Sequence, residues 1–166
     1  ASLHPYTTIQ KIARDSTVEF ILKNCAGATP CRSPRQLMNL AIQTLAVKGY
    51  VLEFGVFKGA SIKYLAKNFP KETVHGFDSF EGLQEAWTHN AKGAFAMSGK
   101  IPKVPKNVHL HKGYFDETLP AWLSTHEDMA AFIHVDCDLR SSTATIFAQL
   151  EERIQPGTII VFDDYF

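Results

Sequence analysis

The sequence has few cysteines, no excess of charge of either sign and no long apolar run. Its three cysteines, Cys25, Cys31 and Cys137, are an odd number without metal-ligand spacing, which argues against a disulfide-rich or zinc-stapled domain. Basic and acidic residues each number 17, so no whole-domain field attracts nucleic acid or an anionic membrane. No stretch is apolar enough to cross a bilayer, and no signal-peptide pattern opens the chain. We therefore expect a cytoplasmic protein with no nucleic-acid or membrane partner.

The sequence contains enough apolar residues to form one hydrophobic core. The chain has 166 residues, 45% of them hydrophobic, which is typical of a single globular domain over residues 1–166. Residues 1–49 have the pattern of two helices, one over 6–24 and one that begins with the N-cap Ser33 and Pro34 and ends by Gly49. Because the chain opens without Met and stops directly after an acidic motif, we expect a C-terminally truncated piece of a longer protein.

After residue 49, strand-like and helix-like segments alternate. The strand-like segments are 50–54 (YVLEF), 73–78 (TVHGFD), 108–111 (VHLH), 131–136 (AFIHVD) and 158–163 (TIIVFD). This alternation predicts an α/β fold with a parallel sheet covered on both faces. Thr143, Phe147, Leu150 and Ile154 share one helical face, which predicts a helix between the last two strands. Residues 79–106 are long, rich in Gly, Lys and Pro, and are typical of a functional loop.

The ends of the first two strands carry the pattern of a ligand site. In sheets of this kind, ligands bind beyond the carboxyl ends of the strands. The first strand ends in "VLEFGVFKGAS", whose glycines let the backbone approach a ligand and whose helix start can hold an anion. The second ends at Asp78, at the spacing where an acid accepts hydrogen bonds from ribose. The alternatives are a tight turn without a ligand and an aspartate that caps a helix.

The third and fourth strands add aromatic residues and histidines. Gly113, Tyr114 and Phe115 follow the third strand and would form a slot for a flat ring such as adenine, although core packing explains these aromatics equally well. We interpret His109, His111 and His134 as structural, because the strand spacing of the first two supplies no third metal ligand.

Two acidic pairs end the last two strands. Asp136 and Asp138 follow one strand, and Asp163 and Asp164 follow the next. Neighbouring parallel strands lie roughly 5 Å apart, so these carboxylates would converge and repel one another unless a cation neutralised them. Oxygen ligands select Mg²⁺, Mn²⁺ or Ca²⁺. The alternative is that some of these aspartates only cap the following helix or turn.

Taken in order, five motifs resemble one known family. "VLEFGVFKGAS", "GFDSFEGL", "KGYFDETLP", "HVDCDLRSST" and "GTIIVFDDYF" are similar to motifs of class I S-adenosylmethionine-dependent methyltransferases, specifically the metal-dependent macrocin O-methyltransferase-like group. The resemblance spans residues 50–166. It implies a Rossmann-like, doubly wound, mainly parallel sheet. In this class the sheet is completed by a C-terminal antiparallel strand pair, which we expect the present chain to lack.

The resemblance also assigns roles to individual residues. Those implied to surround the cofactor are Glu53, Gly55, Phe57, Gly59, Ser61, Asp78, Ser79, Gly113, Tyr114, Phe115 and Asp136. Those implied to bind Mg²⁺ are Asp136, Asp163 and Asp164, while Asp138 is the implied general base beside Asp136. Arg140 departs from the aromatic residue that is common in relatives. It would pair with an anionic acceptor or form a salt bridge.

The implied activity is O-methylation of a small molecule such as a sugar, a polyketide glycoside or a phenol. A metal-bound acceptor hydroxyl is more acidic and fixed in its angle of attack. Rival interpretations are a metal-dependent glycosyltransferase that uses Asp-x-Asp to hold a nucleotide sugar, a nicotinamide dehydrogenase, and a non-catalytic cofactor-binding fragment. We expect the acceptor walls in residues 85–104, with Trp87 and His89. A homodimer would form through the first two helices or the edge of the last strand.

Overall fold

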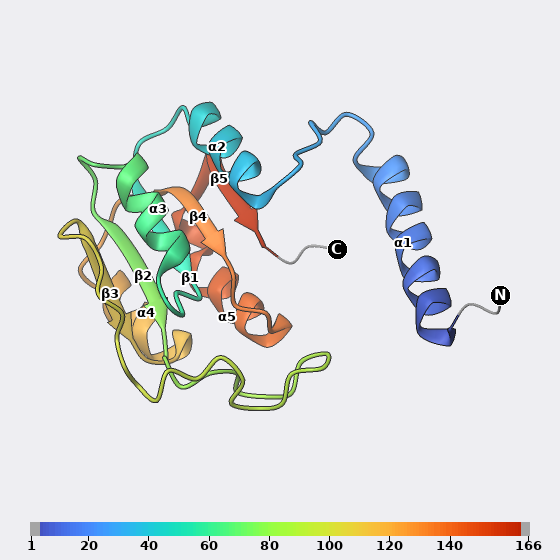
Figure 1. Cartoon of the computed structure of the whole chain (residues 1–166). Helices are drawn as coiled ribbons and strands as arrows, with labels where there is room; N and C mark the ends of the chain where they lie inside the picture. Colours follow the sequence, from blue (N-terminus) through green and yellow to red (C-terminus); the bar gives the residue numbers. More distant parts are fainter. Residues whose placement is uncertain (1–3, 164–166) are drawn as a thin grey trace.

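The computed structural model describes residues 4–163, and at its centre is a five-stranded sheet (Figure 1). The strands are β1 (Tyr50–Phe54), β2 (Val74–Asp78), β3 (Val108–Lys112), β4 (Ala130–Val135) and β5 (Ile154–Phe162). They lie in the order β3-β2-β1-β4-β5, and every described pairing is parallel. Along the chain, β2 and β3 add to one side of β1, and β4 and β5 then add to its other side. This confirms the predicted α/β, Rossmann-like sheet with its order reversed between β1 and β4.

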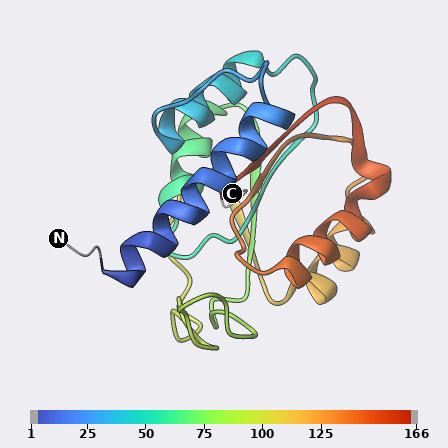
Figure 2. The same ribbon diagram turned by 90° about the vertical axis from the view of Figure 1, so that its right-hand side faces the viewer.

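Helices cover both faces of the sheet (Figure 2). Helices α2 (Pro34–Thr44) and α3 (Ala60–Asn68) lie on one face, and α4 (Phe115–Leu123) and α5 (Arg140–Leu150) lie on the other. Two apolar clusters fill the gaps, one around Ile62 and Phe132 and the other around Phe54, Leu119 and Ile146. Because both faces are buried, the central strands are apolar at nearly every position.

The second helix begins as its sequence predicts and ends earlier. The Ser33 hydroxyl accepts a hydrogen bond from the Gln36 amide at 3.2 Å, and Pro34 is the first helical residue. The helix ends at Thr44 rather than at Gly49 because Leu45 adopts an extended conformation (ψ 118°). Five residues of connection therefore separate α2 from β1.

The last strand is longer than its apolar pattern predicts. Ile154 belongs to β5 rather than to the preceding helix, whose buried positions are Ile146 and Leu150. The pairing of β4 with β5 shifts register between Ala130 and Phe132, and the Thr158 hydroxyl donates to the Ala130 carbonyl across this bulge. Because the bulge interrupts the regular alternation of side chains, a period-two sequence pattern does not predict the early part of β5.

Helix α1 (Pro5–Asn24) stands apart from the sheet (Figure 1). None of its residues is buried, and Ile9, Ile12 and Leu22 are among its exposed apolar side chains. The domain core is therefore built without it. Within residues 4–163, α1 and the other helices are too short or too polar to cross a bilayer.

A group of stacked rings lies beneath α4 and gives two of the histidines a structural role. The His75 Nδ1 atom accepts a hydrogen bond from the Trp122 indole at 3.1 Å and lies 3.1 Å from the His111 Nε2 atom, so His111 supplies the proton of the second contact. Burial, followed by the charges of neighbouring histidines, lowers the pKa of His75 to about 3 and that of His111 to about 4. The pair is neutral in the folded protein at pH 7.

These neutral histidines predict acid sensitivity. Below pH 6.5 the unfolded chain binds protons that the folded chain does not, so the free energy of unfolding falls as the pH drops from 6.5 toward 4. We expect a loss of roughly 2 to 4 kcal/mol from this pair. The measurement is urea denaturation at several pH values. His75→Gln, whose amide oxygen still accepts from Trp122, should flatten the slope, and an unchanged slope would contradict the assignment.

Candidate functional site

A cleft of about 220 Å³ lies beyond the carboxyl ends of the strands and opens to solvent. Its walls are formed by Gly55, Phe57, Asp78, Ser79, Gly82, Leu83, Gln84, Phe95, Gly113, Tyr114, Phe115, Asp136, Cys137, Asp138, Leu139 and Ser142. The cleft lies where the strand order reverses, which is where ligands bind in open parallel sheets. The structure therefore brings eight predicted cofactor residues into one cleft: Gly55, Phe57, Asp78, Ser79, Gly113, Tyr114, Phe115 and Asp136.

The glycine-rich turn after β1 is locked against the end of β4. Gly55 has a φ of +92°, and a Cβ atom there would lie 1.7 Å from the carbonyl oxygen of Asp136. The Gly55 amide donates to the Phe77 carbonyl at 3.0 Å, and the Asp136 amide donates to the Phe54 carbonyl at 2.8 Å. Only glycine fits where these backbones meet. The turn and the acidic end of β4 consequently form one rigid floor.

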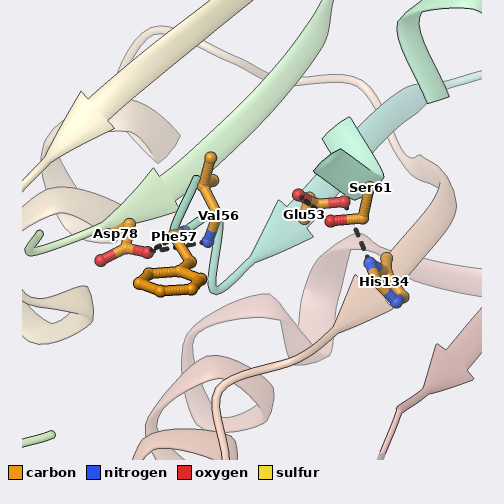
Figure 3. Close-up of polar contacts among 6 residues, drawn as sticks. All are labelled: Glu53, Val56, Phe57, Ser61, Asp78 and His134. Atoms are coloured by element: carbon orange, nitrogen blue, oxygen red, sulfur yellow. Dashed lines mark hydrogen bonds and ion pairs between the residues drawn. The ribbon is translucent and has the colours of Figure 1, made fainter. Parts of the chain in front are cut away.

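Asp78 holds this turn from the β2 side (Figure 3). Its Oδ2 atom accepts hydrogen bonds from the amides of Val56 (2.8 Å) and Phe57 (2.7 Å), and its Oδ1 atom accepts one from Phe80 (2.7 Å). A carboxylate has about four acceptor positions, so one remains for a ligand. Asp78 therefore shapes the turn and also lies on the cleft wall, as the ribose prediction requires.

Glu53, Gly59 and Ser61 are not on the cleft wall, although the resemblance placed them near the cofactor. The Glu53 side chain is fully buried and turns toward α3, where its Oε1 atom accepts from the Ser61 hydroxyl at 3.0 Å. Its Oε2 atom is hydrogen-bonded to the His134 Nδ1 atom at 3.0 Å (Figure 3). Gly59 is the N-cap of α3, with a φ of +78°. These residues support the turn from behind.

Burial and mutual attraction act in opposite directions on the pKa values of Glu53 and His134. Burial raises the pKa of Glu53. Burial alone would lower the pKa of His134, but the hydrogen bond and the charge of Glu53 outweigh that effect and raise it. The two residues are register partners on β1 and β4, so the pair joins the central strands and explains the structural role predicted for His134.

The acidic end of the cleft contains Asp136 and Asp138. Burial, and then the charge of Asp163, raises the pKa of Asp136 to about 7. Asp138 is half-buried with a φ of +59°, a left-handed conformation that is uncommon outside glycine and that clusters at functional sites. Asp164 lies outside the described residues. Within residues 4–163, no three His, Cys, Asp or Glu side chains are arranged to hold a metal ion.

Sequence reasoning identified only part of the wall that the loop after β2 forms. Phe95 lies within the predicted range 85–104, whereas Gly82, Leu83 and Gln84 precede it. Trp87 pairs with Asn90 in a tight turn, and neither Trp87 nor His89 is on the wall. Arg140 is exposed at the start of α5 and is also off the wall. A loop without periodicity carries no signal for which of its residues turn inward.

Comparison with known proteins gives a family for the whole α/β region. Residues 52–165 match the family described as "Methyltransferase domain". The 8-demethyl-8-(2,3-dimethoxy-alpha-L-rhamnosyl)-tetracenomycin-C 4'-O-methyltransferase of Streptomyces olivaceus is 28% identical, over 72% of this chain and 54% of its own length. The chain thus spans about half the length of that curated relative.

Solved structures show the same fold. The crystal structure of the calicheamicin methyltransferase CalS11 superposes with a TM-score of 0.64 at 21% identity, over 98% of this chain and 79% of that one. The apo structure of CalS11, a TDP-rhamnose 3'-O-methyltransferase, superposes with a TM-score of 0.57 at 21% identity, over 99% of this chain and 80% of that one. At these identities the likeness concerns the fold alone. The family match covers well over half of the sequence, and the chain therefore belongs to the methyltransferase domain family, with the class I methyltransferase fold that its motifs predicted.

Proposed function

We propose that the chain is the cofactor-binding domain of an S-adenosylmethionine-dependent O-methyltransferase that acts on a hydroxyl of a small glycosylated molecule. The observation that carries the proposal is the glycine-rich turn, held by Asp78 on one side and by Asp136 on the other, at the floor of a cleft beyond the strand ends. The name of the Streptomyces olivaceus relative supports the acceptor class, since that protein is a 4'-O-methyltransferase of a rhamnosyl-tetracenomycin.

The residues present fit this cofactor. Asp78 keeps one acceptor position for a ribose hydroxyl, and Tyr114 and Phe115 offer aromatic surface on the β3 side for a purine. The carboxylates of Asp136 and Asp138 suit a cationic ligand. When bound, the cofactor supplies an electrophilic methyl group and leaves as a neutral thioether.

On this proposal, the acidic end of the cleft accepts the proton of the acceptor hydroxyl. As the acceptor oxygen forms its bond to the methyl carbon and the sulfur–carbon bond breaks, the hydroxyl proton must pass to a base. We assign that role to Asp138, with Asp136 beside it. Asp138 is half-buried on the cleft wall beside Asp136, where a carboxylate can reach a bound hydroxyl. Among the described wall residues there is no histidine, so we assign the base among the carboxylates.

We also propose that a divalent cation, Mg²⁺ in the first instance, binds at this end. The mutual repulsion of Asp136 and Asp163 supports it, because a bound cation would relieve that repulsion. Asp164 is the third proposed ligand. The described carboxylates alone do not complete a site, so we derive no catalytic step through the ion.

Calorimetric titration with S-adenosylmethionine, with and without Mg²⁺, tests the proposal. We expect micromolar binding that weakens tenfold or more in Asp78→Ala, because that variant frees the amides of Val56 and Phe57 as well as losing the ribose acceptor. Asp128→Ala, an exposed aspartate after α4, is the matched control and should bind normally. Thermal melts establish that each variant is folded. A folded chain that ignores S-adenosylmethionine but binds a UDP-sugar with Mn²⁺ would favour the glycosyltransferase interpretation instead.

A further inference from the structure

The loop after β2 contacts the helix that follows β4. The Ser141 hydroxyl, in the first turn of α5, donates a hydrogen bond to the Glu85 Oε1 atom at 2.9 Å, and the loop passes beside the start of α5 (Figure 1). The chain neighbours of these two residues, Gln84 and Ser142, both lie on the cleft wall. The bond therefore joins two parts of the wall that are 56 residues apart in the sequence.

The loop presents Glu85 from a hydrogen-bonded base. The Leu83 amide donates to the Ala94 carbonyl at 2.9 Å, and the Gly93 amide donates to the Leu83 carbonyl at 2.8 Å. A Cβ atom on Gly82 would lie 2.4 Å from the Ala94 carbonyl oxygen, so the two halves of the loop are in close backbone contact there. Glu85 follows this paired segment directly, and its position is therefore restricted by the main chain.

The start of α5 lacks the groups that usually stabilise a helix N-terminus. Its N-cap is Leu139, whose side chain cannot accept a hydrogen bond, and its first turn contains no acidic residue. Arg140, the first helical residue, adds a positive charge at the end of the helix where the partial charge is already positive. Glu85 supplies from the loop the carboxylate that the first turn lacks.

The segment that precedes α5 carries one of the acidic residues of the cleft. Asp138 comes directly before the N-cap and is half-buried on the wall, with a φ of +59°. The Leu139 amide donates to the Cys137 carbonyl at 2.6 Å, and the Thr143 amide donates to the Leu139 carbonyl at 3.0 Å. The acidic segment and the first turn of α5 are therefore one hydrogen-bonded unit, and a displacement of the helix start would move Asp138.

We infer that Glu85 is a positioning residue, which acts through Ser141 to keep the start of α5, and with it Asp138, at the cleft wall. The inference rests on the proposed function, because the assignment of Asp138 as the base belongs to that proposal. Glu85 is itself exposed and is not a wall residue. An exposed contact contributes little to the free energy of unfolding, so we expect its effect on local geometry rather than on global stability.

The thiol of Cys137 provides a test that needs neither cofactor nor turnover. Cys137 is half-buried on the wall beside Asp138, and its Sγ atom lies 3.5 Å from the Thr143 hydroxyl in the first turn of α5. In the whole chain with Cys25→Ser and Cys31→Ser, Cys137 is the one remaining cysteine. The rate of its reaction with dithionitrobenzoate then measures how often this part of the wall opens.

We expect Glu85→Ala and Ser141→Ala each to raise this rate about fivefold, the factor that corresponds to a shift of about 1 kcal/mol in the opening equilibrium. The double variant should react no faster than either single variant, because both changes remove the same contact. Glu85→Gln, whose amide oxygen can still accept from Ser141, should retain most of the protection. Glu127→Ala, which removes an exposed glutamate between α4 and β4, is the matched control and should leave the rate unchanged.

Two results would overturn the inference. One is a folded Glu85→Ala protein in which Cys137 reacts at the background rate. The other is a fall in the urea midpoint of Glu85→Ala that accounts for the faster reaction, because the contact would then stabilise the whole domain rather than position one segment. Titration with S-adenosylmethionine judges the proposed function separately. If the thiol rates respond as expected and the cofactor does not bind, the proposed function is refuted and the contact between the loop and α5 is retained.

Discussion

Gly55→Ala is expected to destabilise the protein by at least about 4 kcal/mol, enough to leave much of it unfolded at 25 °C. A Cβ atom at this position would lie 1.7 Å from the Asp136 carbonyl oxygen and 2.5 Å from its carbonyl carbon, both main-chain atoms that no side-chain rotation can move. The φ of +92° adds a conformational cost of roughly 1–2 kcal/mol. Relief would require β1 and β4 to separate, although Glu53 and His134 pair across them.

Gly93→Ala is the matched control for this prediction. Gly93 has a similar φ of +83°, but nothing lies within 4 Å of the Cβ that alanine would add. The substitution therefore has only the conformational cost, about 1 kcal/mol. Urea denaturation followed by circular dichroism gives both free energies of unfolding. Equal losses in the two variants would mean that the turn after β1 is not locked against β4.

His134→Ala is the second large effect, with an expected loss of about 3 to 5 kcal/mol. The substitution leaves the Glu53 carboxylate fully buried, with only the Ser61 hydroxyl as a hydrogen-bond partner. A buried charge that loses its partner keeps its desolvation cost, and a cavity between the central strands adds to the loss. Thermal and urea denaturation of the variant beside wild type measure the effect.

A double replacement distinguishes a lost partner from a lost side chain. The double variant Glu53→Leu, His134→Leu contains no buried carboxylate without a partner. It keeps apolar side chains at the position where β1 and β4 pair. We expect the double variant to be more stable than His134→Ala by at least about 1 kcal/mol. A double variant that is no more stable would show that packing, rather than pairing with Glu53, is what His134 contributes.

Local sequence patterns predicted the elements well because those patterns depend on near neighbours. The apolar run at 50–54 coincides with β1, and Ser33 with Pro34 marks the start of α2. Boundaries were less accurate where long-range pairing decides them. The bulge opposite Ala130 extends β5 back to Ile154, and no periodicity within that segment contains the register of its partner strand.

The sequence likewise predicted some residues of the cleft wall and not others. Asp78 was identified by its spacing from the glycines, and Asp136 by its place at the end of an apolar strand; both lie on the cleft wall. Glu53 was placed beside the cofactor by its motif, yet its partner His134 is 81 residues away and turns it behind the wall. Phe95 carries no motif, and only the path of its loop brings it to Phe57.

The sequence by itself determined that this protein is a parallel α/β domain of the methyltransferase family with acidic strand ends, because residue order along strands and turns is enough to specify those features. The tertiary structure alone decided which side chains face the cleft, which support it from behind and which loop residues complete its wall. These depend on register, on the direction of each side chain from its strand and on close backbone contacts such as that of Gly55 with Asp136. Such contacts join residues far apart in the chain, and no local pattern encodes them.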